Sequence, residues 1–226
     1  LSNLYDFNPA TDRVPFEQLP EIDRWALVKL EELKEKVRQS YDRYEFHAIY
    51  HGLNFFCGTT LSAFYLDILK DRLYASATAS PARRAAQTAL YDILDSLLRL
   101  MSPILCFTAP EAWNALHQLG DNGPIDKEIH FAEFLPAQAL SCDPEVMERW
   151  AQLIRVRAEV TRALELARRD KVIGHPLEAE VTLDASGELR DFLHANAAII
   201  REISIVSGLA VGEVRGAGEG ISFASE

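Results

Sequence analysis

FYLDILKDRLY (residues 64–74) runs directly into ASATASPARR (residues 75–84), and this junction decides the fold. The first segment has leucines and aromatics at helical spacing and ends in a dense group of charges, which predicts the end of a helix. Ser80-Pro81 predicts the start of the next helix, because Ser is a favoured N-cap and Pro fits the first helical position. Two long helices with so short a connection are expected to lie antiparallel.

Apolar residues recur at spacings of three and four on both sides of this junction, which extends the helical pattern. The stripes and their breaks predict four helices, at residues 20–44, 44–74, 81–101 and 108–119. Thr108 and Glu111 have the spacing of a capping box for the fourth helix, with Gly120 as its stop. The fold class is therefore mainly α, beginning with an antiparallel helical bundle.

Two glycines lie inside the second predicted helix. Gly52 and Gly58 each cost about 1 kcal/mol against alanine in a helix interior. Close packing of another helix is the expected reason for both.

After residue 120 the pattern changes, and a small α+β domain is predicted. Asp143-Pro144 marks the start of a fifth helix that continues to about Asp170. LEAEVTLD (177–184) alternates apolar and polar residues as a half-buried strand does, a helix is expected near 187–198, and ISIVS (203–207) predicts a second strand. The predicted organisation is a linker from an upstream domain at 1–19, the bundle at 20–120, a connecting loop at 121–142, the long helix with the α+β domain at 143–211, and a Gly-rich tail at 212–226.

The net charge of −11 argues at first against a nucleic-acid partner. Its distribution weakens that argument. Residues 111–148 hold eight acidic and one basic side chain, and residues 176–226 hold nine acidic and three basic ones. The remaining chain is slightly basic, so RNA is not excluded.

Cysteines and motifs indicate neither a metal site nor a catalytic site. Cys57, Cys106 and Cys142 are far apart, and the apolar neighbours of the first two favour buried thiols in a reducing compartment. No GxSxG, HExxH or phosphate-binding lysine loop occurs. No run of 18 apolar residues occurs, so no membrane span is predicted.

The basic side chains near the junction are the candidate site. On a helical projection Lys70 is exposed, and Arg72 lies between the apolar and polar sides, so it is expected to be semi-buried. Both are late in their helix, where the helix dipole favours cations. Arg83 and Arg84 lie in a first helical turn, where the dipole disfavours cations, and such a turn with two arginines suits an anion.

Six stretches, in this order, resemble bacterial isoleucyl-tRNA synthetases in the region after the catalytic domain. They are DRWAL (23–27), YEFHAIYHGLNFFC (44–57), FYLDILKDRLY (64–74), ARRAAQTALYDIL (82–94), MSPILCFTAPEAW (101–113) and KVIGHPLEAEVTL (171–183). The resemblance implies an anticodon-binding helical bundle of the class I synthetase type, followed by a junction region. The chain would then be a fragment without the catalytic, editing and zinc modules.

The resemblance also implies how the parent protein works. The parent would be a cytoplasmic, monomeric ligase that joins isoleucine to its tRNA with ATP and magnesium, with zinc in its terminal cysteine module. The fragment itself is expected to have no catalytic residues and to bind no cofactor or metal. Its expected partner is the isoleucine-accepting tRNA, with no DNA and no membrane.

These two lines combine in one hypothesis about the site. Lys70, Arg83 and Arg84 hold phosphates of the anticodon stem or loop, while Arg72 and Gln87 reach sugars or base edges. Two alternatives stay open: the equivalent domain of a valyl or leucyl synthetase, or a helical scaffold that binds a protein.

Overall fold

The structure is a computed structural model that describes residues 2–118, 128–138, 140 and 143–213. Its contacts divide the chain into two compact units, Leu1–Cys142 and Asp143–Glu226. The first is a helical bundle and the second combines helices with a small sheet, which confirms the predicted fold class.

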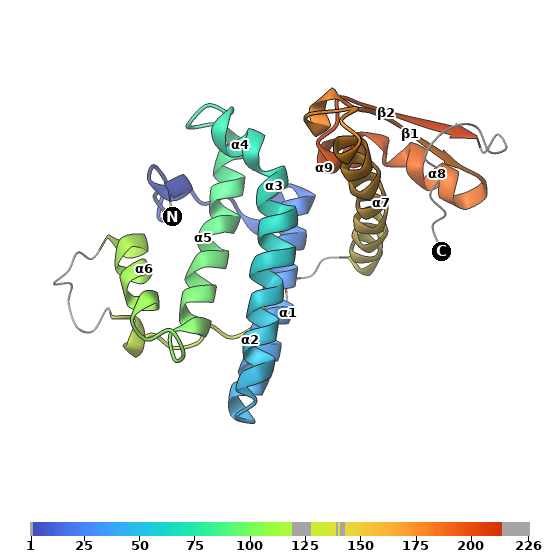
Figure 1. The fold of residues 1–226 in the computed structure, drawn as a ribbon. Coiled ribbons are helices and arrows are strands. Elements are labelled where there is room, and N and C mark those ends of the chain that lie inside the picture. Colours follow the sequence, from blue (N-terminus) through green and yellow to red (C-terminus); the bar gives the residue numbers. More distant parts are fainter. Residues whose placement is uncertain (1, 119–127, 139, 141–142, 214–226) are drawn as a thin grey trace. The chain divides into compact units, whose positions relative to one another are not determined.

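The first unit is built from long helices that lie side by side (Figure 1). Its helices are α1 (Glu21–Asp42), α2 (Phe46–Phe55), the π-helical segment η3 (Phe56–Tyr65), α3 (Leu66–Ile68), α4 (Lys70–Tyr74), α5 (Pro81–Met101) and α6 (Thr108–His117). Short 3₁₀ turns occur at Ser2–Leu4, Phe16–Gln18 and Ile129–Phe131. The segments α2, η3 and α3 form one rod that packs against α1.

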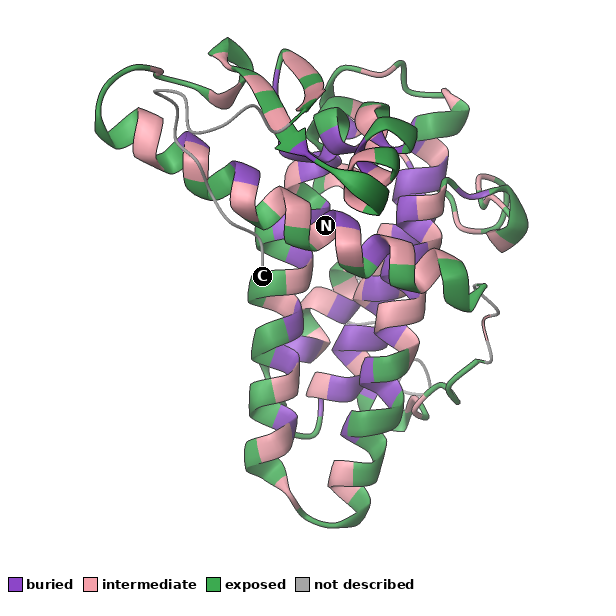
Figure 2. Ribbon diagram, turned by 90° about the vertical axis from the view of Figure 1, so that its right-hand side faces the viewer, coloured by how far each residue is buried: buried purple, intermediate pink, exposed green. Residues whose placement is uncertain are grey.

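The core of this unit lies between α1, the α2–η3 rod and α5, because each helix turns its apolar stripe inward (Figure 2). Trp25 of α1 meets Phe64 of η3 edge to face, with ring centroids 5.1 Å apart. Leu98 of α5 and Trp113 of α6 belong to a smaller apolar cluster that attaches α6. Burial of such side chains is the main stabilising contribution to a bundle of this kind.

The junction quoted at the start forms the hairpin that its residues predict. The Ser80 hydroxyl accepts a hydrogen bond from the Arg83 backbone N–H at 3.2 Å, so Ser80 caps α5, and Pro81 occupies its first position. α5 ends at Met101, before the predicted break at Ser102. Within residues 2–19, Phe7 and Leu19 are buried, and the Phe7 ring lies 5.8 Å from the Tyr91 ring of α5.

Three local predictions in this unit are wrong. Thr108 is the first residue of α6 and not its N-cap; Phe107 occupies the N-cap position and has no side-chain acceptor, so no side-chain cap hydrogen bond forms. Gly58 faces open space, so no helix packs on it, whereas a Cβ on Gly52 would lie 3.6 Å from Leu33.

The third correction concerns a cysteine. Cys106 is exposed because it lies in the turn between α5 and α6, and Cys57 is only half-buried. Burial raises the pKa of the Cys57 thiol. Cys142 and Gly120 lie outside the described residues.

The second unit begins with α7 (Pro144–Arg169), which Asp143 caps as predicted. After a 3₁₀ turn at Pro176–Glu178 come β1 (Glu180–Ala185), α8 (Gly187–Ala195), α9 (Ala197–Ser204) and β2 (Gly208–Glu213). The strands pair in parallel, with Glu180 opposite Gly208, so α8 and α9 form the crossover that parallel strands require. Val160 and Leu164 of α7 pack against Val206 in the core of this unit.

The second strand lies later in the chain than predicted. ISIVS (203–207) contains the end of α9, because Ile200 and Ile203 share one helical face and are both buried. Ile205 then adopts a left-handed conformation that ends the helix, and β2 starts at Gly208. The predicted tail at 212–226 overlaps the end of β2, and its residues 214–226 lie outside the described part.

None of the helices in the described part is long and apolar enough to cross a membrane.

Candidate nucleic-acid interface

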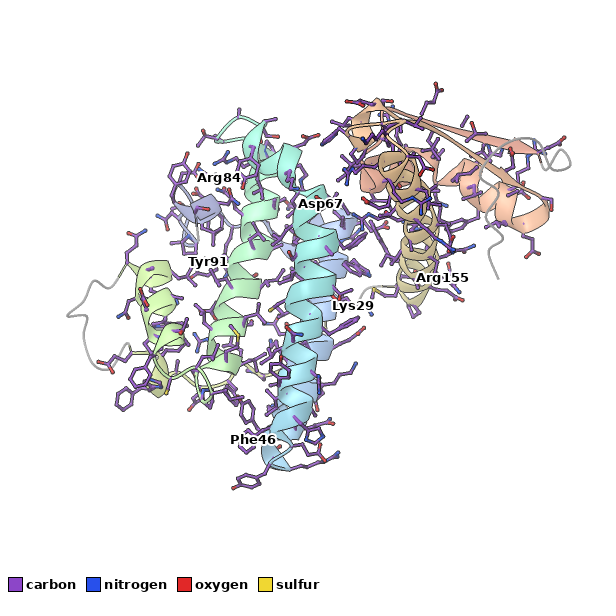
Figure 3. The ribbon with its side chains drawn as sticks, viewed as in Figure 1. Lys29, Phe46, Asp67, Arg84, Tyr91 and Arg155 are labelled. Carbon is purple, nitrogen blue, oxygen red and sulfur yellow. The ribbon has the colours of Figure 1, made fainter. Side chains whose placement is uncertain are left out.

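The predicted site residues lie at one end of the bundle, where Figure 3 shows Arg84 beside the N-terminal segment. We call residues 3–13 and 70–87 at this end the rim. Asp6 lies at its centre and accepts hydrogen bonds from Gln87 Nε2 at 2.7 Å and from Arg83 Nη2 at 3.3 Å. Burial alone would raise the pKa of Asp6, but the hydrogen bond from Gln87 and the charge of Arg83 bring that pKa below its ordinary value.

Arg83 and Arg84 are both engaged inside the rim. Arg83 Nη1 donates to the Leu73 carbonyl at 2.6 Å, and its side chain is only 9% exposed. Arg84 Nη1 donates to the Asp6 carbonyl at 2.7 Å, and Nη2 lies 3.5 Å from an Asp12 carboxylate oxygen. These contacts attach residues 3–13 to the start of α5.

A second group of polar contacts, which we call the hub, centres on Asp23 and Arg72 and fixes the position of α4. Arg72 makes a two-pronged ion pair with Asp23, with contacts of 3.0 and 2.6 Å, and also donates to the Ala82 carbonyl at 2.9 Å. The Tyr65 hydroxyl donates to Asp23 at 2.7 Å. Burial raises the pKa of Tyr65 well above its ordinary value, and the Asp23 charge adds to that rise. The hub thus joins α1, η3, α4 and the start of α5.

Lys70 is the exposed cation that the sequence predicts. Its side chain is 65% exposed and its Nζ lies 2.7 Å from an Asp67 carboxylate oxygen. The hydrogen bond and the charge of Asp67 raise the pKa of Lys70. A surface pair of this kind contributes little to stability, so Lys70 can exchange Asp67 for a phosphate at small cost.

The structure therefore brings the five predicted residues to one end of the bundle but gives them different surroundings. Arg72 is semi-buried and Lys70 is exposed, as expected. The premise that Arg83 and Arg84 lack structural partners is wrong, because carboxylates and carbonyls of the fold neutralise their charge. Gln87 is fully buried, and its side-chain amide donates a hydrogen bond to the Asp6 carboxylate. Contact of any of these five residues with tRNA stays a prediction.

Sequence reasoning missed the acidic partners of this site. Asp6, Asp12 and Asp23 lie between 42 and 81 positions from the arginine, glutamine and tyrosine side chains that they bind. No local pattern marks them. Asp6 and Asp12 before α1 and Asp23 in its first turn, ahead of a basic hairpin, are a weak signal that does not select a pairing.

The described residues contain no group of three or more His, Cys, Asp or Glu side chains that could hold a metal ion. Lys70 is an exposed cation, whereas Arg83 and Arg84 are paired with carboxylates of the fold. This arrangement can contact a polyanion through Lys70 although the surface as a whole is not strongly positive.

The fold and this rim define the class of protein: a helical-bundle module of the kind that aminoacyl-tRNA ligases use to hold tRNA. The family model described as "Anticodon-binding domain of tRNA ligase" matches residues 23–183, and the chain belongs to this family.

The individual relatives with high sequence identity are isoleucine–tRNA ligases. The chain is 57% identical over its whole length to an isoleucine–tRNA ligase of Desulfotalea psychrophila, and covers 24% of that protein. It is 45% identical over its whole length to an isoleucine–tRNA ligase of Desulfitobacterium hafniense, again covering 24%. An isoleucine–tRNA ligase of Geobacter sulfurreducens is 45% identical over 97% of the chain, which covers 23% of it. The chain thus spans about a quarter of these relatives.

Proposed function

We propose that the chain is the anticodon-binding region of an isoleucine–tRNA ligase and holds the isoleucine-accepting tRNA. The observation that carries this proposal is the family match across residues 23–183 together with the identity to isoleucine–tRNA ligases. These relatives favour the isoleucyl type over the valyl and leucyl types. They also favour a tRNA-binding role over a protein-binding scaffold.

The whole protein would be a cytoplasmic, monomeric enzyme that joins isoleucine to tRNA with ATP and magnesium. The chain covers 24% of its isoleucine–tRNA ligase relative in Desulfotalea psychrophila, and we assign those activities to the remainder of the whole protein. Zinc would belong to a cysteine module outside the chain. The role of the chain itself would be to position tRNA.

Within the rim, we assign the five candidates two kinds of role. Lys70 contacts an RNA phosphate directly, because it is exposed and weakly held. Arg72, Arg83, Arg84 and Gln87 keep the hairpin and the N-terminal segment in the shape that presents Lys70. If one of these four also touches RNA, it must first leave a carboxylate or carbonyl of the fold.

Titration of the chain with an isoleucine-accepting tRNA transcript tests this proposal. We expect tighter binding than to a tRNA with a different anticodon, and an affinity that falls steeply with salt. Lys70→Ala should weaken binding and reduce the salt slope by about 1, without changing stability. Lys29→Ala is the matched control, because Lys29 is also paired with an acid three positions along its helix but lies outside the rim.

Equal affinity for both transcripts would contradict anticodon recognition. An unchanged salt slope in Lys70→Ala would remove Lys70 from the interface. The double variant Arg83→Ala, Arg84→Ala is expected to lose both tRNA affinity and unfolding free energy, because both side chains hold Asp6 and its carbonyl.

A further inference from the structure

The other end of the bundle carries an exposed group of aromatic rings. Tyr44, Phe46 and Tyr50, which we call the aromatic patch, are 80%, 51% and 62% exposed. The rings of Tyr44 and Phe46 lie 6.4 Å apart, and Phe46 and Tyr50 are one helical turn apart on α2. Figure 3 shows Phe46 at the opposite end of the bundle from Arg84. Single exposed rings are ordinary on protein surfaces, but adjacent ones call for a reason.

Tyr44 occupies a backbone position that does not favour tyrosine. Its φ is 57°, in the left-handed region, because α1 ends here and the N–H groups of Tyr44 and Glu45 bond back to carbonyls of its last turn. Glycine is the usual residue at such a position, since it adopts this conformation without strain. The chain keeps a tyrosine whose ring is mostly in solvent, so burial does not compensate for the strain. Strained residues of this kind concentrate at functional sites.

The charge around the patch is unlike that of the rest of the chain. Residues 46–66 contain no Asp, Glu, Lys or Arg, although a quarter of the chain is charged. Exposed α2 residues beside the patch include His47 and His51, and the Tyr50 and His51 rings lie 5.3 Å apart. A helix face of rings and imidazoles without carboxylates does not repel a polyanion.

Unpaired cations adjoin the patch at the end of α1. Lys36, Arg38 and Arg43 are exposed, and none of them forms an ion pair within the described residues. Glu35, Asp42 and Glu45 are the acids of the same stretch, so residues 35–45 have no net charge within a chain of −11. Aromatic rings that stack bases, next to cations that meet the backbone, are the two components of single-stranded nucleic-acid sites.

From these observations we infer that the aromatic patch binds unpaired bases of an RNA loop by stacking, with Arg43 and its neighbours on the adjoining phosphates. This inference rests on the proposed tRNA-binding function and assigns the bases and the rim phosphates to different ends of the bundle. Phe46 lies at the start of the α2–η3–α3 rod and Lys70 begins α4 just beyond the end of that rod, so the length of the rod separates the two residues. A folded RNA, rather than a short peptide, can reach both.

Fluorescence anisotropy with three RNAs tests the inference: the isoleucine-accepting tRNA, an unstructured strand of about 12 nucleotides, and its blunt duplex. The chain should bind the strand more tightly than the duplex. Tyr44→Ala and Phe46→Ala should each weaken strand and tRNA binding by about 5-fold or more. Tyr50→Phe keeps the ring and should bind like the unaltered chain, whereas Tyr50→Ala should not.

Phe131→Ala is the matched control, because Phe131 is also exposed (65%) but lies on a separate 3₁₀ turn.

Two results would overturn the inference. The alanine variants could bind the strand as tightly as the unaltered chain does, or the unaltered chain could bind strand and duplex equally tightly. Normal tRNA binding by those variants would overturn it and leave the proposed function intact. Failure of the unaltered chain to bind tRNA would count against the proposed function, while the strand titration still decides the role of the patch. Loss of self-association in the variants, with unchanged RNA affinity, would assign the patch to a second copy and overturn the inference.

Discussion

Asp23 is a carboxylate with no exposed surface, and it forms a two-pronged ion pair with Arg72. Asp23→Asn removes the negative charge from this largely buried pair. Breaking one side of a buried pair costs about 3 kcal/mol or more of unfolding free energy. Urea unfolding followed by circular dichroism measures this loss.

Two variants make the measurement specific. Tyr65→Phe removes a single hydrogen bond to Asp23 and should cost about 1 kcal/mol. Asp71→Asn, on an exposed acid of α4, should cost almost nothing. If Asp23→Asn lowered the free energy of unfolding by less than about 1 kcal/mol, the Asp23–Arg72 pair would not stabilise this end of the bundle.

Asp6 gives the rim a defined dependence on pH. Its pKa is lowered in the folded chain, so its contribution to stability is complete above the unfolded value of about 3.9 and is lost as pH falls through the lower folded value. Between about pH 6 and pH 3, the unaltered chain should therefore lose more unfolding free energy than Asp6→Asn. Parallel curves for the two proteins would contradict the assignment.

For single residues, the sequence predicts the contacts that form between neighbours in the chain. Ser80 and Asp143 cap their helices because the signal lies within three residues of the group it serves. The exposure of Lys70 and the half-burial of Arg72 follow from helical periodicity alone. The partners of Arg83 and Arg84 could not be predicted, because Asp6 and Asp12 meet them only after the bundle has folded.

Among the elements, the π-helical segment η3 is the one that periodicity cannot detect. The predicted helix at 44–74 is continuous in outline, but residues 56–65 have wider turns than an α-helix. Apolar spacing of three to four fits both forms over ten residues. The misplaced second strand has the same origin, since Ile200 and Ile203 suit a helix face while ISIVS also suits a strand.

Gly58 lies in this segment and leads to a prediction for the element. A Cβ at this position would meet no atom within 4 Å, so alanine fits without a clash. Gly58→Ala should raise the unfolding free energy by about 0.5–1 kcal/mol, because it removes backbone freedom from the unfolded chain. Gly52→Ala should gain at least as much, because its Cβ would make an ordinary van der Waals contact with Leu33 at 3.6 Å. Thermal unfolding of both variants checks the order, and a loss in Gly58→Ala would mean that the wide turns require glycine.

For the whole molecule, the two units are expected to unfold separately. All the contacts that build the rim and the aromatic patch lie within the first unit, and α7 begins the second with a core of its own. The second unit is the shorter, and small units bury a smaller share of their surface. It should therefore unfold at the lower urea concentration.

The tryptophans report on each unit by itself. Trp25 and Trp113 are buried in the first unit and Trp150 in the second, and the chain has no others. Fluorescence of Trp150→Phe should show only the later transition. The double variant Trp25→Phe, Trp113→Phe should show only the earlier one, with circular dichroism of the unaltered chain showing both. Coincident midpoints in all three proteins would mean that the units unfold as one, and tRNA held at the rim would then stabilise the α+β unit as much as the bundle.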